Sequence, residues 1–316
     1  SLLNEIIPLT IPRIYLENFL KIEKKIKFKD WPKNPKYIFT SNAFHYDDIF
    51  KYWCAKKNIN GSKIIIGQHG GHYGLGLFCS SQKHELSISD HYFSWGWEND
   101  GYNNIIPIGN FFNFNKKIKY NKNGGLLIIS NVFSKYFYRC FSMPIGHQYL
   151  SYLKFISGFI NKINIKIKKN LFIRLTNRDF DWDLTNYWKT NHPDINFDNH
   201  SIKFLNTVKN YRLFVSTFNT TSFLETLKLN LPTIIILDKN YWELNEESNK
   251  HINKLKEIGV FFDNYNEASN FINNNWNRIE QWWWSSKVQI CVKEFCNLYS
   301  CRDYDVENNF KKFFKI

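Results

Sequence analysis

The chain has 316 residues, with 42 Lys and Arg against 28 Asp and Glu, so its formal net charge is +14 with histidine neutral. A hydrophobic fraction of 43% and an aromatic fraction of 18% exclude a disordered chain, which lacks the apolar surface to offset its ordering entropy. We attribute much of the positive charge to the lysine bias of an AT-rich genome, and therefore do not expect nucleic acid as a partner. Phosphate groups, anionic substrates or an anionic membrane surface suit the charge equally well.

The start of the chain and its cysteines indicate a soluble, cytoplasmic protein. No apolar run reaches the roughly 18 residues that span a bilayer, and the segment after Ser1 has no signal-peptide layout. Only three or four strands are predicted before residue 118, so the N-terminal domain is expected either to be small or to lack its opening strands. The cysteines form no C-x-x-C pair, so reduced thiols are expected at Cys54, Cys79, Cys140, Cys291, Cys296 and Cys301.

Short apolar runs alternate with longer amphipathic segments along the chain, a pattern typical of parallel βαβ units with helices on both faces of a sheet. The predicted strands are Tyr37–Thr40, Lys63–Gly67, His91–Trp95, Leu126–Ser130, Leu171–Leu175, Leu213–Ser216 and Thr233–Leu237. The predicted helices are Pro12–Ile26, Asp47–Asn58, His147–Ile163, Ser201–Lys209, Thr221–Leu229, Glu246–Ile258 and Asn266–Tyr299.

The polar segment Lys116–Gly125 breaks this alternation and is predicted to link two α/β domains, 1–118 and 119–316. The last helical stretch carries Trp276 and the run Trp282–Trp284. These tryptophans are expected to fill the core, with stacking on a sugar as the alternative, and the stretch could pack across the domain junction.

The first candidate ligand site follows the strand Lys63–Gly67, at the strand end where ligands bind in open α/β sheets. Glycines permit positive φ and a close approach of backbone N–H groups to a ligand, and a structural turn would not need the polar residues between them. His69 could act as a general base or as a donor to an anionic leaving group. The remaining candidates in this loop are Gln68, Gly70, Gly71, His72 and Tyr73.

The second candidate site lies between the strand ending at Ser216 and the helix that carries Glu225. Hydroxyls and amides at a helix N-terminus make a phosphate site, although an ordinary capped helix is the alternative. Glu225 could accept a hydrogen bond from a ribose or sugar hydroxyl. The donor-binding candidates are Ser216, Thr217, Asn219, Thr220 and Thr221, with one of the last two threonines as the cap.

The third candidate is Arg174, which lies within a predicted strand. A guanidinium facing the interior is costly unless it meets an anion. It could hold a diphosphate or a carboxylate of a ligand, or it could pair with Asp179 or Asp181.

The fourth candidate site again follows a strand and contains Asn42, His45, Asp47 and Asp48. The two aspartates at a helix start could simply complement the helix dipole. Alternatively, one of them or His45 is a catalytic acid, base or nucleophile.

Several catalytic motifs are missing from the sequence. There is no P-loop, no dinucleotide-binding glycine fingerprint, no nucleophile elbow and no H-E-x-x-H zinc motif. Kinases, dehydrogenases and serine hydrolases are therefore disfavoured. Asp179, Asp181 and Asp183 could bind a metal in pairs, but they lie at a predicted strand-to-helix turn, and we expect no metal and no bound cofactor.

Together, five segments of the chain resemble a bacterial family of transferases from O-antigen and other surface-polysaccharide gene clusters. The segments are Ile38–Asn42, Gly67–Gly74, Ser94–Trp97, Thr220–Leu227 and Asn230–Thr233. The resemblance implies two Rossmann-like domains of the GT-B type that bind a nucleotide sugar without a metal. It makes 1–118 the acceptor side and 119–316 the donor side, with C-terminal helices that pack back.

The predicted function is glycosyl transfer from a nucleotide sugar to a bacterial surface polysaccharide or lipopolysaccharide acceptor. A CMP-activated acidic sugar such as Kdo is among the donors that the resemblance allows. The protein is predicted to act at the inner face of the cytoplasmic membrane, which it would contact peripherally. The alternatives are a polyol-phosphate or phosphosugar transferase on the same architecture, and a non-catalytic glycan- or nucleotide-binding module.

Overall fold

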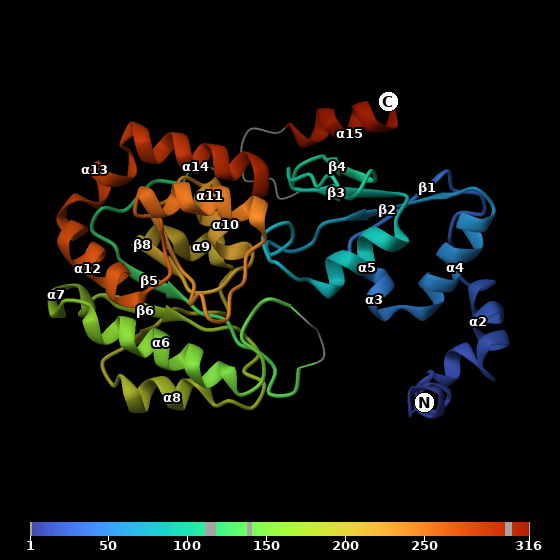
Figure 1. Ribbon diagram of the computed structural model, residues 1–316, viewed down its shortest axis with the longest axis horizontal. Coiled ribbons are helices and arrows are strands. Elements are labelled where there is room, and N and C mark those ends of the chain that lie inside the picture. Colours follow the sequence, from blue (N-terminus) through green and yellow to red (C-terminus); the bar gives the residue numbers. More distant parts are fainter. Residues whose placement is uncertain (1, 111–117, 138–140, 301–304, 316) are drawn as a thin grey trace. The chain divides into compact units, whose positions relative to one another are not determined.

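The computed structural model describes residues 2–110, 118–137, 141–300 and 305–315 (Figure 1). The chain divides into two compact units. Unit 1 comprises Ser1–His69, His84–Ser94 and Asn99–Ile106, and unit 2 comprises Gly70–Lys83, Trp95–Glu98 and Pro107–Ile316. The domain boundary was expected after residue 118, whereas the compact units change over at Ile106 and two earlier segments belong to unit 2. Cys140, Cys301 and the part of the predicted linker before residue 118 lie outside the described residues.

Unit 1 contains a four-stranded sheet in the order β1-β2-β3-β4. The strands β1, β2 and β3 pair in parallel and match three predicted strands, while β4 was not predicted. Their bounds are β1 Tyr37–Thr40, β2 Lys63–Gly67, β3 His91–Ser94 and β4 Ile105–Pro107. The first five helices are α1 Leu2–Thr10, α2 Phe19–Ile26, α3 Ala43–Tyr46, α4 Asp48–Ile59 and α5 Ser80–Ile88, with a 3-10 turn η1 at Arg13–Tyr15.

A small aromatic core holds α4 against this sheet. Trp53 and Cys54 of α4 are buried with Ile38 of β1, and Trp31 and Phe50 pack onto them. The Trp31 ring lies 5.1 Å from Trp53 and 5.9 Å from Phe50, so three large rings share one cluster. This packing fixes the helix that follows the carboxyl end of β1.

Unit 2 contains a six-stranded sheet in the order β10-β9-β8-β5-β6-β7, in which all neighbouring strands pair in parallel. Chain order runs outward from β5 in one direction and from β8 in the other, which is the doubly wound order with its switch point between β5 and β8. The strands are β5 Gly125–Ile129, β6 Leu171–Arg174, β7 Asn196–Phe197, β8 Tyr211–Ser216, β9 Thr233–Ile236 and β10 Phe261–Phe262.

Helices cover both faces of this sheet, with α6 and α8 on one side and α10, α11 and α14 on the other (Figure 1). The strands β5 and β9 are buried along their whole length because both faces of the sheet are covered. The helices of unit 2 are α6 Gln148–Lys162, α7 Ile165–Lys168, α8 Leu184–Asn191, α9 Phe204–Thr207, α10 Thr221–Lys228, α11 Glu246–Glu257, α12 Tyr265–Asn275, α13 Ile279–Trp283, α14 Ser286–Tyr299 and α15 Val306–Phe314. The 3-10 turns are η2 Val208–Asn210 and η3 Trp276–Arg278.

The predicted helix Asn266–Tyr299 is four shorter elements, from α12 to α14. The core prediction is confirmed for Trp283 alone, since Trp276 and Trp282 are half-buried and Trp284 is exposed. Trp283 is fully buried and donates from Nε1 to the Asn230 carbonyl at 3.1 Å, and Trp282 donates to the Ile258 carbonyl at 2.8 Å. The short breaks let both indole N–H groups find acceptors.

An excursion of the chain before residue 100 belongs to unit 2. Gly76 forms an isolated antiparallel bridge with Leu244, and Cys79 forms another with Phe141. The Asn245 side chain donates to the Gly74 carbonyl at 2.8 Å. These bonds attach residues 70–83 to the C-terminal part of the sequence.

The architecture is therefore an α/β fold with two Rossmann-like units, as the sequence predicted. In the described part of the chain, no helix combines the length and apolar character that a membrane crossing requires.

Candidate functional site

The first site gathers three titratable side chains of unit 1. His45 lies on α3 after β1, and His69 lies two residues beyond β2, so the two parallel strands deliver both rings to the same edge of the sheet. Glu85 reaches the same place from α5. Its Oε1 atom lies 3.5 Å from His45 Nε2 and 3.7 Å from His69 Nδ1. We call these three residues the histidine–glutamate cluster.

The carboxylate of this cluster is buried, whereas its rings reach solvent. The Glu85 side chain is 0% exposed, against 15% for His45 and 27% for His69. The buried Tyr92 hydroxyl donates to Glu85 Oε2 at 3.3 Å, which orients Oε1 toward the two rings. A buried carboxylate held against imidazole nitrogens is the arrangement that positions a histidine for proton transfer.

Asp47 and Asp48 do not belong to this cluster. Asp47 is the N-cap of α4 and accepts from the backbone N–H groups of Ile49 and Phe50 at 3.0 Å each. Asp48 pairs with Lys51 at 2.9 Å and accepts from the Tyr15 hydroxyl. The contacts of both aspartates are those of the non-catalytic alternative, because the first turn of α4 needs acceptors for its amides.

The polar neighbours of the two histidines have backbone roles. Asn42 occupies the N-cap position of α3, but its side chain makes no capping bond. Gln68 is 4% exposed, and its backbone N–H donates to the Phe93 carbonyl at 2.9 Å, which extends the β2–β3 pairing past the end of β2.

The glycine-rich loop continues into unit 2 after His69. A Cβ atom on Gly71 would lie 2.6 Å from the backbone carbon of Thr220 and 2.7 Å from the backbone nitrogen of Thr221. Only glycine permits this approach, because the atoms opposite are backbone and cannot turn aside. The loop therefore packs directly on the start of α10, with Tyr73 buried beside it.

A cavity of about 240 Å³ lies at the switch point of unit 2. Its walls come from the glycine-rich loop, from the segments that follow β5 and β8, and from single aromatic residues elsewhere. Representative lining residues are His72, Asn131, Phe133, Asn219, Thr220 and Trp242. This is the crevice between β5 and β8 in which doubly wound sheets bind their ligands.

Two polar features of the cavity wall lack partners among the described residues. The Asn219 side chain is nearly buried, at 4% exposed, and its Oδ1 atom has no hydrogen-bond partner in the described part of the chain. Thr220 occupies the N-cap position of α10 without a side-chain capping bond, contrary to the expectation that a threonine caps this helix. The first amides of α10 are therefore left for another acceptor, and an anion fits that position.

Ser216 and Thr217 were predicted in the same donor set, but the structure uses their hydroxyls internally. Thr217 Oγ1 donates to the Ile129 carbonyl at 3.0 Å and lies 2.7 Å from the Tyr152 hydroxyl. Ser216 Oγ donates to the Phe218 carbonyl at 3.2 Å. Both residues are buried and tie β8 to its surroundings, and neither lines the cavity.

Glu225 lies one turn inside α10, half-buried among apolar neighbours. Burial raises the pKa of its carboxyl to about 7, and the positive charge of Arg174 opposes the shift only in part. Glu225 can therefore both donate and accept a hydrogen bond near neutral pH.

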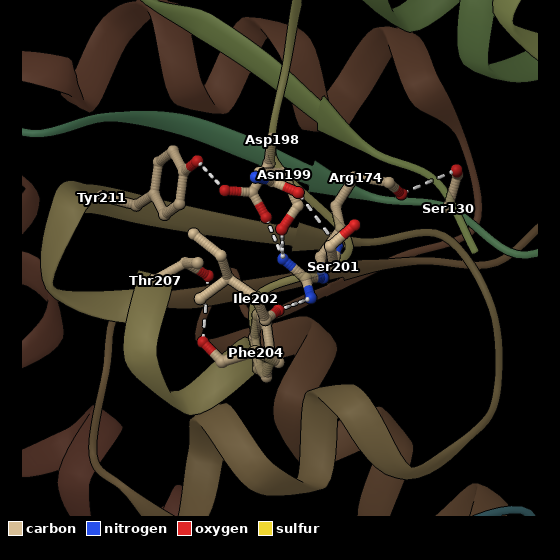
Figure 2. A network of polar contacts seen from close by, with 9 residues as sticks. All are labelled: Ser130, Arg174, Asp198, Asn199, Ser201, Ile202, Phe204, Thr207 and Tyr211. Carbon is tan, nitrogen blue, oxygen red and sulfur yellow. Dashed lines mark hydrogen bonds and ion pairs between the residues drawn. The ribbon is translucent and has the colours of Figure 1, made fainter. Parts of the chain in front are cut away.

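Arg174 is the centre of a closed ion-pair network in unit 2 (Figure 2). Its guanidinium pairs with Asp198, which follows the two-residue strand β7, and donates to the Ile202 carbonyl at 2.6 Å. Asp198 also accepts from the Tyr211 hydroxyl. The alternative prediction, that Arg174 pairs with Asp179 or Asp181, was wrong. Asp179 instead accepts from backbone N–H groups of its own turn.

A family model described as LIC12162 family transferase matches residues 1–314. The chain therefore belongs to this family of transferases. A comparison with curated proteins finds no match.

Solved structures show similarity at low sequence identity. A protein from Listeria monocytogenes assigned as a UDP-N-acetylglucosamine 2-epimerase matches with a TM-score of 0.52 and 10% identity, over 94% of this chain and 77% of that one. The wall teichoic acid polymerase TagF matches with a TM-score of 0.42 and 10% identity, over 81% and 69%. WaaG, a glycosyltransferase involved in lipopolysaccharide biosynthesis, matches with a TM-score of 0.39 and 10% identity, over 94% of this chain and 80% of that one. The first of these supports the fold, and the other two scores are too low to support an argument.

Proposed function

We propose that this transferase is a glycosyltransferase that uses a nucleotide-sugar donor. One observation carries the proposal: the switch-point cavity of unit 2 combines a buried, unsatisfied amide oxygen at Asn219 with the uncapped start of α10. An unpaired buried acceptor costs free energy until a ligand supplies a donor. A ribose or base supplies such a donor, and a phosphate suits the helix N-terminus.

The cavity would hold the nucleotide through its aromatic and polar walls together. Phe133 and Trp242 line the cavity and would offer flat apolar surface to a base, while Thr220, at the N-cap position of α10, would lie nearest the phosphate. Glu225, with a pKa of about 7, would bind a hydroxyl of the donor. This assignment requires no metal, because helix dipoles and amides offset the charge of the leaving phosphate.

The histidine–glutamate cluster of unit 1 would supply the base. Glu85 lies on the Nδ1 side of His69, so Nε2 would take the proton of the acceptor hydroxyl. The acceptor oxygen then bonds to the anomeric carbon, and the bond from that carbon to the donor phosphate breaks. The nucleotide phosphate leaves with the bonding electron pair.

The finer assignments rest on the sequence resemblance. They are a CMP-activated acidic sugar such as Kdo as one donor, a bacterial surface polysaccharide or lipopolysaccharide as acceptor, and work at the inner face of the cytoplasmic membrane. The donor screen described next addresses the first of them.

The test is a thermal-shift screen of CMP-, UDP-, GDP- and dTDP-sugars together with a CDP-polyol. A donor at a hundredfold excess over its Kd should stabilise the protein by about 2.7 kcal/mol. Asn219→Ala should raise the Kd for the donor about tenfold to a hundredfold, since one buried hydrogen bond to the donor is lost. Asn249→Ala, on the exposed face of α11, should leave binding unchanged.

Three outcomes would contradict the proposal. A shift with the CDP-polyol alone would indicate a polyol-phosphate transferase, and binding without turnover would indicate a binding module. No shift with any nucleotide would refute nucleotide binding at this cavity.

A further inference from the structure

The histidine–glutamate cluster has the composition and spacing of a transition-metal site. Each of its residues offers one ligand atom, and the three atoms lie within 4.8 Å of one another. They come from α3, from the end of β2 and from α5, so three separately fixed elements converge on one point.

The distances suit a zinc-sized ion. Zinc binds imidazole nitrogen and carboxylate oxygen at about 2.0–2.2 Å, which places neighbouring ligand atoms of a tetrahedral site about 3.4 Å apart. The two measured separations from Glu85 Oε1 are 3.5 and 3.7 Å. The two ring nitrogens lie within 4.8 Å of each other, so rotation of the rings about their side-chain bonds would close the site around an ion.

The surroundings of the cluster also match such a site. The Tyr92 hydroxyl bonds to the carboxylate oxygen that faces away from the rings, as the outer partners of metal ligands do. The rings are partly exposed, so a water could complete a site with three protein ligands. Two imidazoles and one carboxylate favour zinc, copper, nickel or cobalt over magnesium or calcium.

We infer that His45, His69 and Glu85 bind one divalent transition-metal ion of the zinc class, and that the bound ion inhibits transfer. The binding stands on the geometry of the cluster alone. The inhibition rests on the proposed function, because an ion on Nδ1 of His69 leaves the only proton of the neutral ring on Nε2, which could then no longer take the acceptor proton.

Cobalt(II) is the probe, since its visible absorption reports a low-coordinate site directly. The full chain should develop visible bands that saturate at one equivalent and disappear when Zn²⁺ is added. His45→Gln and Glu85→Gln should each abolish the bands, and Tyr92→Phe should weaken binding about tenfold. His147→Gln, an exposed histidine of unit 2, should leave the spectrum unchanged.

Circular dichroism checks that each variant is folded. Because His45 is partly exposed, His45→Gln tests the site without changing the buried Glu85 carboxylate. The inference is overturned if the wild type shows no bands, or if the bands persist in both ligand variants. Loss of the bands in His147→Gln would also overturn it.

Turnover separates this inference from the proposed function. Stoichiometric Zn²⁺ should stop sugar transfer, a chelator should restore it, and Mg²⁺ should have no effect. Cobalt bands in a protein without any transferase activity would support the metal site and refute the proposed function. Sugar transfer that Zn²⁺ leaves unchanged would refute the inhibition.

Discussion

The two units carry strand-end sites of opposite chemical character. In unit 1 the groups that converge are ionisable, with two histidines around a buried carboxylate. In unit 2 the described residues of the cavity wall include one histidine, His72, and no carboxylate, and the other polar features of the wall include the Asn219 amide and the start of α10, beside aromatic rings. Arg174, the cation of unit 2 that the sequence assigned to a donor, is paired with Asp198 instead.

The difference follows from what each task requires. A proton can be moved only by a group that titrates, whereas a phosphate can be held by fixed backbone dipoles that cost little to bury. A buried cation in the cavity would carry a desolvation penalty that amides avoid. The proposed function accordingly gives proton transfer to unit 1 and donor binding to unit 2.

The largest expected effect is on turnover. Glu85→Gln keeps the shape of the cluster but removes its charge, so turnover should fall about 10²- to 10⁴-fold, the range attributed to general-base catalysis. The thermal shift caused by the donor should stay. Steady-state rates measure the first effect and melting curves the second, with His147→Gln as the control. If donor binding fell as much as turnover did, the division of tasks would be wrong.

Arg174→Ala should chiefly destabilise unit 2. The variant leaves the Asp198 carboxylate buried without its partner, which costs about 3–5 kcal/mol. Urea denaturation measures the loss. The double variant Arg174→Met with Asp198→Asn should recover most of it, since no charge remains buried. Unchanged stability together with a lost donor shift would instead make Arg174 a donor contact.

Glu225 gives stability a pH dependence. Its native pKa of about 7 lies above the ordinary 4.5, so the native state keeps a proton that the unfolded state has lost. The free energy of unfolding should therefore fall as pH rises from 4.5 through 7, by about 3 kcal/mol. Urea denaturation across this range should show that the free energy of unfolding of Glu225→Gln increases relative to that of the wild type as pH rises. Parallel curves would place the carboxyl in contact with water.

The smallest effect is expected at Asp47. Asp47→Ala removes the cap of α4 and should cost about 1 kcal/mol without changing turnover. Asp47→Ser retains a capping oxygen and should restore most of this stability in chemical denaturation. A collapse of turnover at unchanged stability would make Asp47 catalytic.

The sheets were largely predictable because their central strands are apolar and bounded by turn residues. All seven predicted strands exist, whereas β7 and β10 have two residues each and carry too little pattern to recognise. The missed helix α5 has a weakly amphipathic sequence that gives no clear period. The helices α1, α3, α7, α8 and α15 were also not predicted.

The site was predictable only where it follows a strand end. His45, His69, Asn219 and Thr220 were found in this way, since the ends of parallel strands share an edge. Glu85 was missed because it lies on α5, and one glutamate on a polar helix looks exposed in sequence. Asp198 was missed as the partner of Arg174 because it follows β7, one of the strands too short to predict.

The excursion of residues 70–83 into unit 2 has a consequence for dissecting this protein. A cut near residue 118 would separate Gly76 and Cys79 from their bridge partners Leu244 and Phe141. It would also remove Gly71 from the start of α10. The C-terminal fragment would then lack one wall of its cavity, and the N-terminal fragment would carry an orphaned segment. The two halves should consequently behave as a complementing pair that becomes native only when both are produced together.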